Sequence, residues 1–186
     1  MQERKNGFLR YMFFLDNEYQ LALSDQRKFA KVVLFSQKEM EESLKELGPD
    51  PLFIKEEEFV TLFQGKKREI KPLLMDQHFL SGVGNIYAAE VLFKAKIHPQ
   101  KRADLIKKKD LKNIYYLLQE TLKKAIELKG DSTSDFRLIT GEKGGYQNFH
   151  LVYNRKGEKC FNCEEKIEKS VVGGRGTYYC KKCQKY

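Results

Sequence analysis

The feature that most constrains this chain is a pair of Cys-x-x-Cys motifs near its C-terminal end. Cys160 and Cys163 form the first motif, and Cys180 and Cys183 form the second. Each motif turns tightly enough to present two sulfurs at one side of a tetrahedron, so the pair predicts one zinc ion bound by four thiolates. The motifs use all 4 cysteines of the chain. Two disulfides or four unrelated buried thiols are the alternatives, and the spacing favours the metal.

The segment between the two motifs predicts a β-hairpin. Apolar and polar residues alternate from Lys166 to Val172, Gly173–Gly176 supply a turn, and Thr177–Tyr179 lead back to the second motif. Arg175 would then lie at the tip of a hairpin that the metal holds rigid. A glycine-flanked arginine in that place is suited to a phosphate or a groove, although an ordinary solvated turn arginine remains the alternative.

The charge of the chain points to a polyanionic partner. Its 35 Lys and Arg residues exceed its 26 Asp and Glu residues, which gives a formal net charge of +9. Such a charge favours nucleic acid first and an anionic membrane surface second. No run approaches the roughly 18 apolar residues of a membrane span, and no export signal is present. Thiolate zinc without spare cysteines fits a reducing compartment, so we expect the cytoplasm.

The N-terminal part of the chain predicts β-structure. Gly7–Leu15, Glu18–Leu23 and Phe29–Phe35 are short segments rich in aromatic and β-branched residues, and Asp16–Asn17 suits a turn between the first two. The first segment is apolar on both faces except at Arg10, so it requires cover on both sides. Only six residues, all polar except Met1, precede it. We therefore expect the chain to begin inside a domain whose other strands would lie upstream.

Helical patterns replace the strand pattern from Ser36 onward. Ser36 and Glu39 form a capping box that opens a helix, and Gly48-Pro49 ends it after Leu47. Three further helices are predicted, at Lys55–Gln64, Lys71–Gln77 and Asp110–Lys129. The last is long and amphipathic, and Gly130 closes it.

A glycine-rich turn at Ser81–Asn85 precedes another predicted helix, Ile86–Lys96. A Gly-x-Gly turn lets the backbone approach closely, and the free amides at a helix start attract an anion. Asn85 either caps this helix or donates its amide to a phosphate. A plain corner between two helices is an equally good reading of the same turn. Glu90, the acid within the apolar helix, is interpreted as a hydrogen-bonded structural residue rather than a catalytic base.

The remaining stretches predict a loop and no catalytic set. Thr140–Asn148 contains several glycines and predicts a mobile loop, followed by an extended Phe149–Tyr153. The three histidines are scattered and lack metal-ligand spacing, so we interpret all of them as structural; they are His78, His98 and His150. The sequence contains no Ser/His/Asp set, no Walker loop and no repeat.

Five segments, taken in order, form a recognisable set. They are Ser24–Phe29, Leu47–Leu52, Asp76–Pro99, Val152–Gly157, and Arg175–Cys180 together with Cys183-Gln184. They resemble five segments of bacterial formamidopyrimidine-DNA glycosylase, in the family shared with endonuclease VIII. In the same order, these are its Asp-Pro-Arg-Arg-Phe loop, its Leu-Gly-Pro-Glu-Pro-Leu segment, its helix-two-turn-helix core, its Val-Tyr-Gly-Arg-x-Gly segment and the end of its zinc finger. The whole chain is similar to the C-terminal two-thirds of such an enzyme.

The resemblance implies base-excision repair of DNA. The family excises oxidised purines and then cleaves the abasic strand by β- and δ-elimination, after flipping the damaged base out of the stack. It implies that Lys71, Asn85 and Arg175 grip phosphates around the lesion, and that Tyr153 and Arg155 also contact DNA. Arg27 and Phe29 would fill the gap left by the extruded nucleotide, with a core strand residue as the alternative for Phe29.

The resemblance also implies that the Thr140–Asn148 loop closes over the flipped base and reads it with backbone amides. One departure from the family is large. Its nucleophile is an N-terminal proline next to a glutamate, whereas this sequence starts Met-Gln-Glu-Arg. A lysine of the same N-terminal part is absent too, and Gln26 and Asn154 replace a proline and a glycine. We therefore expect no catalytic residue in this chain and no cleavage by it alone.

These inferences define an α+β chain with three parts. We predict the remnant of an N-terminal β-sandwich domain at 1–35, a helical helix-two-turn-helix DNA-binding domain with the lesion loop at 36–157, and a C-terminal β-hairpin zinc finger at 158–186. The predicted protein is a monomer of the bacterial cytoplasm that binds damaged or abasic duplex DNA at the nucleoid and not a membrane, with a separate N-terminal fragment as a further partner. A non-catalytic zinc-dependent DNA-binding or regulatory protein is the alternative, and an RNA-associated zinc ribbon is a third.

Overall fold

The computed structural model describes residues 7–133, 136–138 and 140–186. The chain forms two compact units, Met1–Glu42 and Ser43–Tyr186. The division into 1–35, 36–157 and 158–186 stays a prediction. Across the described residues, no helix combines the length and the apolar character needed to cross a bilayer.

The first unit contains the predicted hairpin. Strand β1 (Leu9–Phe14) pairs antiparallel with β2 (Gln20–Ser24), and Met12 lies opposite Ala22. The predicted turn is present, since the side-chain oxygen of Asn17 accepts the backbone N–H of Tyr19 at 3.3 Å. The hairpin therefore follows from the alternation and the turn residues together.

The third predicted strand, Phe29–Phe35, is wrong. These residues carry no strand, and Leu34 is 98% exposed. The carboxylate of Asp25 accepts the backbone N–H groups of Arg27 at 2.8 Å and of Ala30 at 2.7 Å, so the chain turns at this point. In the described residues of this unit, β1 and β2 pair only with each other, and Phe29–Phe35 joins neither of them.

Helix α1 (Gln37–Lys45) starts at the predicted capping box. Glu39 accepts the backbone N–H of Ser36 at 2.8 Å, and the hydroxyl of Ser36 accepts the backbone N–H of Glu39 at 3.4 Å. The chain then passes Gly48, where an added Cβ would lie 2.4 Å from the backbone carbon of Phe79. A side chain at this position is excluded by that close approach.

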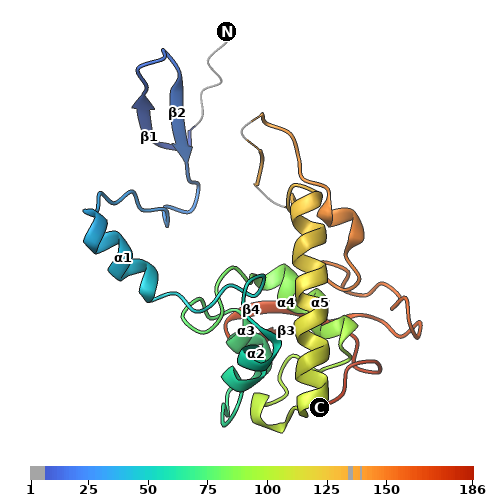
Figure 1. The fold of residues 1–186 in the computed structure, drawn as a ribbon. Helices are drawn as coiled ribbons and strands as arrows, with labels where there is room; N and C mark the ends of the chain where they lie inside the picture. Colours follow the sequence, from blue (N-terminus) through green and yellow to red (C-terminus); the bar gives the residue numbers. More distant parts are fainter. Residues whose placement is uncertain (1–6, 134–135, 139) are drawn as a thin grey trace. The chain divides into compact units, whose positions relative to one another are not determined.

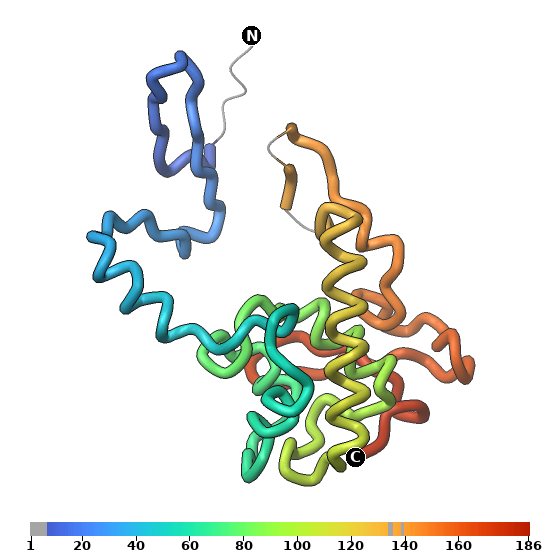
Figure 2. Tube along the Cα trace, viewed as in Figure 1, coloured from blue at the N-terminus to red at the C-terminus, as the bar shows by residue number. Residues whose placement is uncertain are grey.

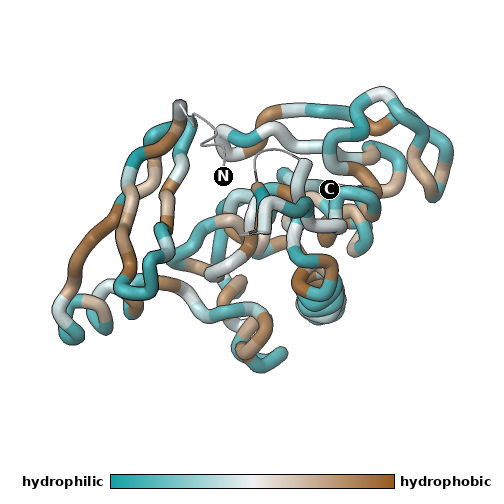
Figure 3. Tube along the Cα trace, turned by 90° about the horizontal axis from the view of Figure 1, so that it is seen from above, coloured by the Kyte–Doolittle hydropathy of each residue, from teal (hydrophilic) through white to brown (hydrophobic). Residues whose placement is uncertain are grey.

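The second unit is built around four helices (Figure 1). They are α2 (Glu56–Leu62), α3 (Ile70–Leu74), α4 (Asn85–Lys94) and α5 (Lys108–Glu127), with the short 3-10 helix η1 (Ala103–Leu105) before α5. Helix α5 packs against α4 and α2, and α4 packs against α3. The core includes Phe59, Phe63, Leu92, Ile114 and Leu118. Seen almost end-on in Figure 3, α5 carries its hydrophobic residues on one side, as its sequence predicts.

The helix boundaries differ from the predicted ones by a few residues. The helix predicted at Lys71–Gln77 ends at Leu74, and the one predicted at Ile86–Lys96 begins at Asn85. The end of α5 agrees with its glycine, because Gly130 has a φ of +85° and its N–H donates to the carbonyl of Ala125 at 2.8 Å. Among the described residues, the next helical element after α5 is the 3-10 helix η2 (Tyr146–Phe149), so Phe149 belongs to a helical turn and not to an extended segment (Figure 2).

The C-terminal hairpin consists of β3 (Glu168–Val172) and β4 (Arg175–Tyr179). The turn has only two residues, Gly173 and Gly174, with φ of +57° and +73°, as a type I′ turn requires. Arg175 is therefore the first residue of β4, opposite Val172, rather than part of the turn. The module shares its apolar core with α4, because Ala89 and Phe93 pack with Cys160, Ile167 and Cys180.

The chain end fastens this module to the end of α4. The side chain of Gln184 accepts the backbone N–H of Cys180 at 2.9 Å and donates to the carbonyl of Ile97 at 2.9 Å. Lys185 donates its N–H to Lys96, and its carbonyl accepts the N–H of His98 at 2.9 Å. Metal motif and helix end thus share one set of hydrogen bonds.

Candidate functional site

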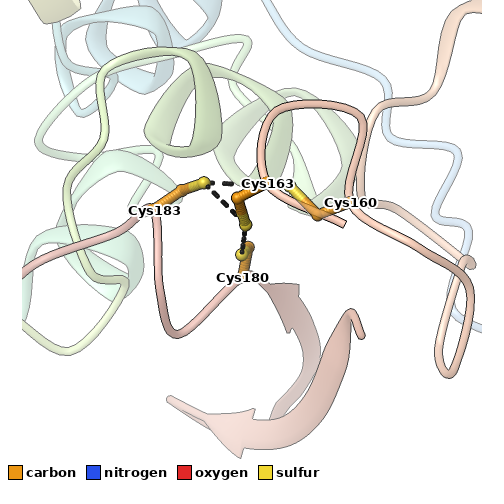
Figure 4. Close-up of side chains that lie close together, drawn as sticks. All are labelled: Cys160, Cys163, Cys180 and Cys183. Carbon is orange, nitrogen blue, oxygen red and sulfur yellow. Dashed lines mark hydrogen bonds between the residues drawn. The ribbon is translucent and has the colours of Figure 1, made fainter. Parts of the chain in front are cut away.

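The four cysteines lie together in the second unit and fit one zinc ion. Their sulfurs all lie within 4.8 Å of one another, with Cys160 and Cys183 at 3.8 Å and Cys163 and Cys180 at 3.4 Å (Figure 4). A tetrahedral Zn–S distance of about 2.3 Å places sulfurs about 3.8 Å apart. The predicted ligand set is confirmed, and one zinc ion is the group that fits it.

The backbone around the cysteines prepares the thiols for a metal. The N–H of Glu164 donates to the carbonyl of Cys160 at 2.9 Å, and the equivalent bond in the second motif joins Gln184 to Cys180 at 2.9 Å. A backbone hydrogen bond from Glu165 lowers the pKa of Cys163 to about 7, which favours the thiolate. Burial raises the pKa of Cys180, so this thiol keeps its proton in the absence of a cation. Binding of a metal ion then displaces the proton.

Two of the residues that are predicted to bind phosphate form a hydrogen bond with each other. The ammonium of Lys71, on α3, donates to the side-chain oxygen of Asn85 at 2.5 Å. The amide nitrogen of Asn85 donates in turn to the carbonyl of Gly176, on β4, at 3.1 Å. Asn85 is the first residue of α4 and Gly84 is its N-cap, so the predicted capping role of Asn85 is wrong. Its side chain instead joins three elements.

Arg175 adds a second positive charge beside this chain of bonds. Lys71 is buried, and burial, followed by the positive charge of Arg175, lowers its pKa to about 8. In the described part of the chain, neither residue forms an ion pair with a carboxylate. Two neighbouring cations without a carboxylate form a site that an anion stabilises.

The position of Arg175 depends on a contact between the hairpin turn and α3. A Cβ added to Gly173 would lie 2.7 Å from Cγ of Pro72, which shows how closely the turn packs on this ring. Pro72 follows Lys71 directly, so the same contact places Arg175 beside the lysine. The sequence indicated a glycine turn and a proline near a helix start, but not that the two meet.

The side chains of Arg155 and Tyr153 contact other residues of the protein. The guanidinium of Arg155 donates to Glu158 at 2.8 Å and to the carbonyl of Leu151 at 2.7 Å, and it lies 3.7 Å from the ring centre of Phe161. The ring of Tyr153 contacts Tyr178 at 5.2 Å between centroids. These contacts show what positions the two residues, and their DNA contacts stay a prediction.

Arg27 and Phe29 lie in the first unit. Phe29 is 73% exposed, so it is not a core strand residue, and the guanidinium of Arg27 lies 5.0 Å from its ring centre. Their predicted role in a DNA gap stays a prediction.

Glu90 is a structural residue, as expected. One oxygen accepts the backbone N–H groups of Val152 at 3.0 Å and Tyr153 at 2.8 Å, and the other accepts that of Leu151 at 2.7 Å. A buried carboxylate on α4 thereby holds the segment that leads into the metal module.

An apolar cavity of about 500 Å³ adjoins these elements. It is lined by α5, by residues 50–52 and by Phe136 and Leu138, and Tyr87 of α4 also contributes. A cavity of this size falls in the range that holds a small organic ring system. No local sequence pattern indicates this cavity, because its walls come from segments far apart in the chain.

The helical body and the four-cysteine hairpin define a class of protein, the proteins that combine a helix-two-turn-helix domain with a zinc finger. Residues 47–137 match the family model described as the formamidopyrimidine-DNA glycosylase H2TH domain, and residues 157–185 match the zinc finger found in FPG and IleRS. The chain belongs to the formamidopyrimidine-DNA glycosylase family.

Individual relatives agree with this assignment. The chain is 36% identical over 190 residues to the formamidopyrimidine-DNA glycosylase of Bacillus subtilis, covering 98% of this chain and 68% of the relative. It is 40% identical over 181 residues to that of Pelotomaculum thermopropionicum, covering 94% of this chain and 64% of the relative. The chain thus spans about two thirds of the length of these relatives.

Solved structures show the same similarity. The MutM (FPG) protein of Thermus thermophilus matches with a TM-score of 0.87 and 35% identity, over 96% of this chain and 69% of that one. The Lactococcus lactis Fpg in complex with DNA containing an abasic site matches with a TM-score of 0.83 and 36% identity, over 90% and 63%. The predicted fold class is confirmed.

Proposed function

We propose that this chain binds damaged or abasic duplex DNA in bacterial base-excision repair, as the DNA-binding part of a formamidopyrimidine- and 8-oxoguanine-DNA glycosylase with AP lyase activity. The observation that carries the proposal is the meeting of Lys71, Asn85 and Arg175 from three separate elements. Because DNA is the partner, we place the action of the chain at the nucleoid in the bacterial cytoplasm, as a monomer.

The cavity beside Tyr87 is a candidate binding site for an extruded base, which supports the proposal. It is apolar, it is about 500 Å³ in volume, and it adjoins the segment that precedes the Thr140–Asn148 loop. In this proposal the loop covers the base, Arg27 and Phe29 occupy the gap in the duplex, and Tyr153 and Arg155 add contacts on the metal-module side.

Replacing Arg175 by Ala tests the phosphate site. The charge-assisted contact contributes about 1.5–3 kcal/mol, so we expect about 10- to 150-fold weaker binding and a salt slope smaller by about one unit. Fluorescence anisotropy on an abasic and an intact duplex of several sequences measures both quantities. Arg102→Ala removes an equal charge from the loop before η1, where Arg102 pairs with Asp104, and should change affinity little.

The outcome also separates two functions. A loss that is uniform across sequences, together with a preference for abasic over intact duplex, supports repair. A loss confined to one sequence would contradict the phosphate role and favour the regulatory DNA-binding protein.

We further propose that these 186 residues do not by themselves perform the lyase step. The covalent intermediate of that step requires an amine of lowered pKa that reaches the sugar, and no residue of the chain matches the proline and glutamate of the family. A polypeptide carrying those residues would complete the site. Borohydride treatment of the chain with an abasic duplex should give no cross-linked product on a denaturing gel, and a product would show that a nucleophile is present.

A further inference from the structure

A buried hydrogen bond between two side chains joins the segment after α5 to the segment after η2. Nε2 of His150 lies 2.5 Å from Oδ2 of Asp131, and the two side chains are only 7% and 4% exposed. The partners are 19 residues apart, one directly after Gly130 at the end of α5 and the other directly after η2. The pair therefore joins the two ends of one long loop, and neither the phosphate site nor the metal site uses it.

Backbone hydrogen bonds also connect the two sides of the loop base. Gly145 donates its N–H to Leu128 at 2.7 Å, and Tyr146 donates to Gly130 at 3.0 Å. Gly144 approaches Gly130 so closely that an added Cβ would lie 2.3 Å from the carbonyl oxygen of Gly130. These backbone contacts order the base of the loop, and the hydrogen bond between His150 and Asp131 adds a side-chain contact that holds its two ends together.

Ring contacts extend from the pair to the other functional elements. The ring of His150 lies 5.3 Å from that of Tyr153 and 6.0 Å from that of Tyr146. Tyr146 is buried and contacts Tyr87 edge-on at 5.2 Å, and Tyr87 lies in the first turn of α4 and lines the apolar cavity. A displacement of His150 would therefore move the cavity wall and the segment before the metal module together.

We infer that Asp131 and His150 are positioning residues that hold this loop base in the arrangement by which the chain distinguishes an abasic or extruded site from intact duplex. The inference rests on the proposed function for its DNA part. A buried polar group that loses its hydrogen-bond partner is costly, so the pair keeps both ends of the loop in one arrangement. It contacts no DNA group in this scheme and acts through Tyr146, Tyr87 and the backbone.

The test compares three variants of the chain. Asp131→Ala removes the pair, and Asp131→Asn keeps an oxygen that accepts a hydrogen bond from Nε2 of His150. Glu127→Ala removes the same charge from the exposed end of α5 and serves as the matched control, since any general gain in attraction to DNA is equal in it. Each is titrated with an abasic and an intact duplex of identical sequence.

We expect Asp131→Ala to lower the ratio of the two affinities about tenfold, in the usual range of coupling between sites. Asp131→Asn should recover most of the ratio, and Glu127→Ala should leave it unchanged. An unchanged ratio in Asp131→Ala, or an equal loss on both duplexes, would overturn the positioning role.

Hydrogen exchange on the DNA-free chain tests the same residues independently. The amides of Gly144, Gly145 and Tyr146 should exchange faster in Asp131→Ala than in Glu127→Ala, while the amides of α4 and α5 stay protected and show that the variant is folded. Unchanged exchange at these three amides would refute the clamp. A wild-type chain without preference for abasic duplex would refute the proposed function instead, and the exchange result would still decide whether the pair holds the loop.

Discussion

Removal of zinc should abolish duplex binding and unfold residues 158–186, while α4 and α5 remain helical. Binding of a structural zinc ion supplies about 10 kcal/mol or more of folding free energy, which exceeds what a hairpin of two five-residue strands can replace. Arg175 and Gly176 lie on that hairpin, so the phosphate site loses its arginine and the carbonyl that holds Asn85. Circular dichroism reports the helices, proton spectra report the hairpin, and anisotropy reports DNA binding.

A chelator and its non-chelating isomer form the control pair, and added zinc should restore both the spectrum and the affinity. Cys163→Ser should reproduce the effect of the chelator without any reagent. Hairpin resonances that survive complete loss of metal would contradict the structural role of the ion.

Replacement of Glu90 by Ala should cause a large loss of stability. The change leaves the N–H groups of Leu151, Val152 and Tyr153 without their acceptor, at about 1–3 kcal/mol for each buried donor that finds no water. We expect the free energy of unfolding in urea to fall by about 3 kcal/mol or more. The segment from Leu151 to Arg155 should become the first part of the unit to exchange its amides.

Glu90→Gln separates the charge from the geometry. The glutamine oxygen can still accept from two of the three amides, but its NH₂ group would face the third donor, so an intermediate loss is expected. Glu120→Ala, on the exposed side of α5, removes a carboxylate that pairs with Lys94 and should cost less than about 1 kcal/mol. Equal stability of Glu90→Ala and the Glu120 control would show that the three hydrogen bonds do not hold the segment.

Local patterns predicted the features that depend on neighbours in sequence. The thiolate set, the capping box at Ser36, the glycine end of α5 and the hairpin before Cys180 each need only a few adjacent residues, and the structure contains them all. The resemblance named Lys71, Asn85 and Arg175, and the structure brings these three together.

Features that depend on distant partners could not be predicted in this way. Nothing near Asp131 indicates that its partner is His150, and nothing near Gly173 indicates Pro72. The strand expected at Phe29–Phe35 has the composition of a strand, but the carboxylate of Asp25 takes two backbone amides and turns the chain. A side-chain hydrogen bond decided the backbone path there, against the residue pattern.

Helix α4 is fastened to the metal module at both of its ends. Asn85 bonds to Gly176 at the start, and Ile97, just beyond the other end, bonds to Gln184 next to the last cysteine. The metal module is therefore packed along α4 and held at both ends of the helix, and it is not joined to it by a flexible linker alone. The conformational entropy of the module relative to α4 is lost when the chain folds. Little further entropy is therefore lost when the module binds a phosphate.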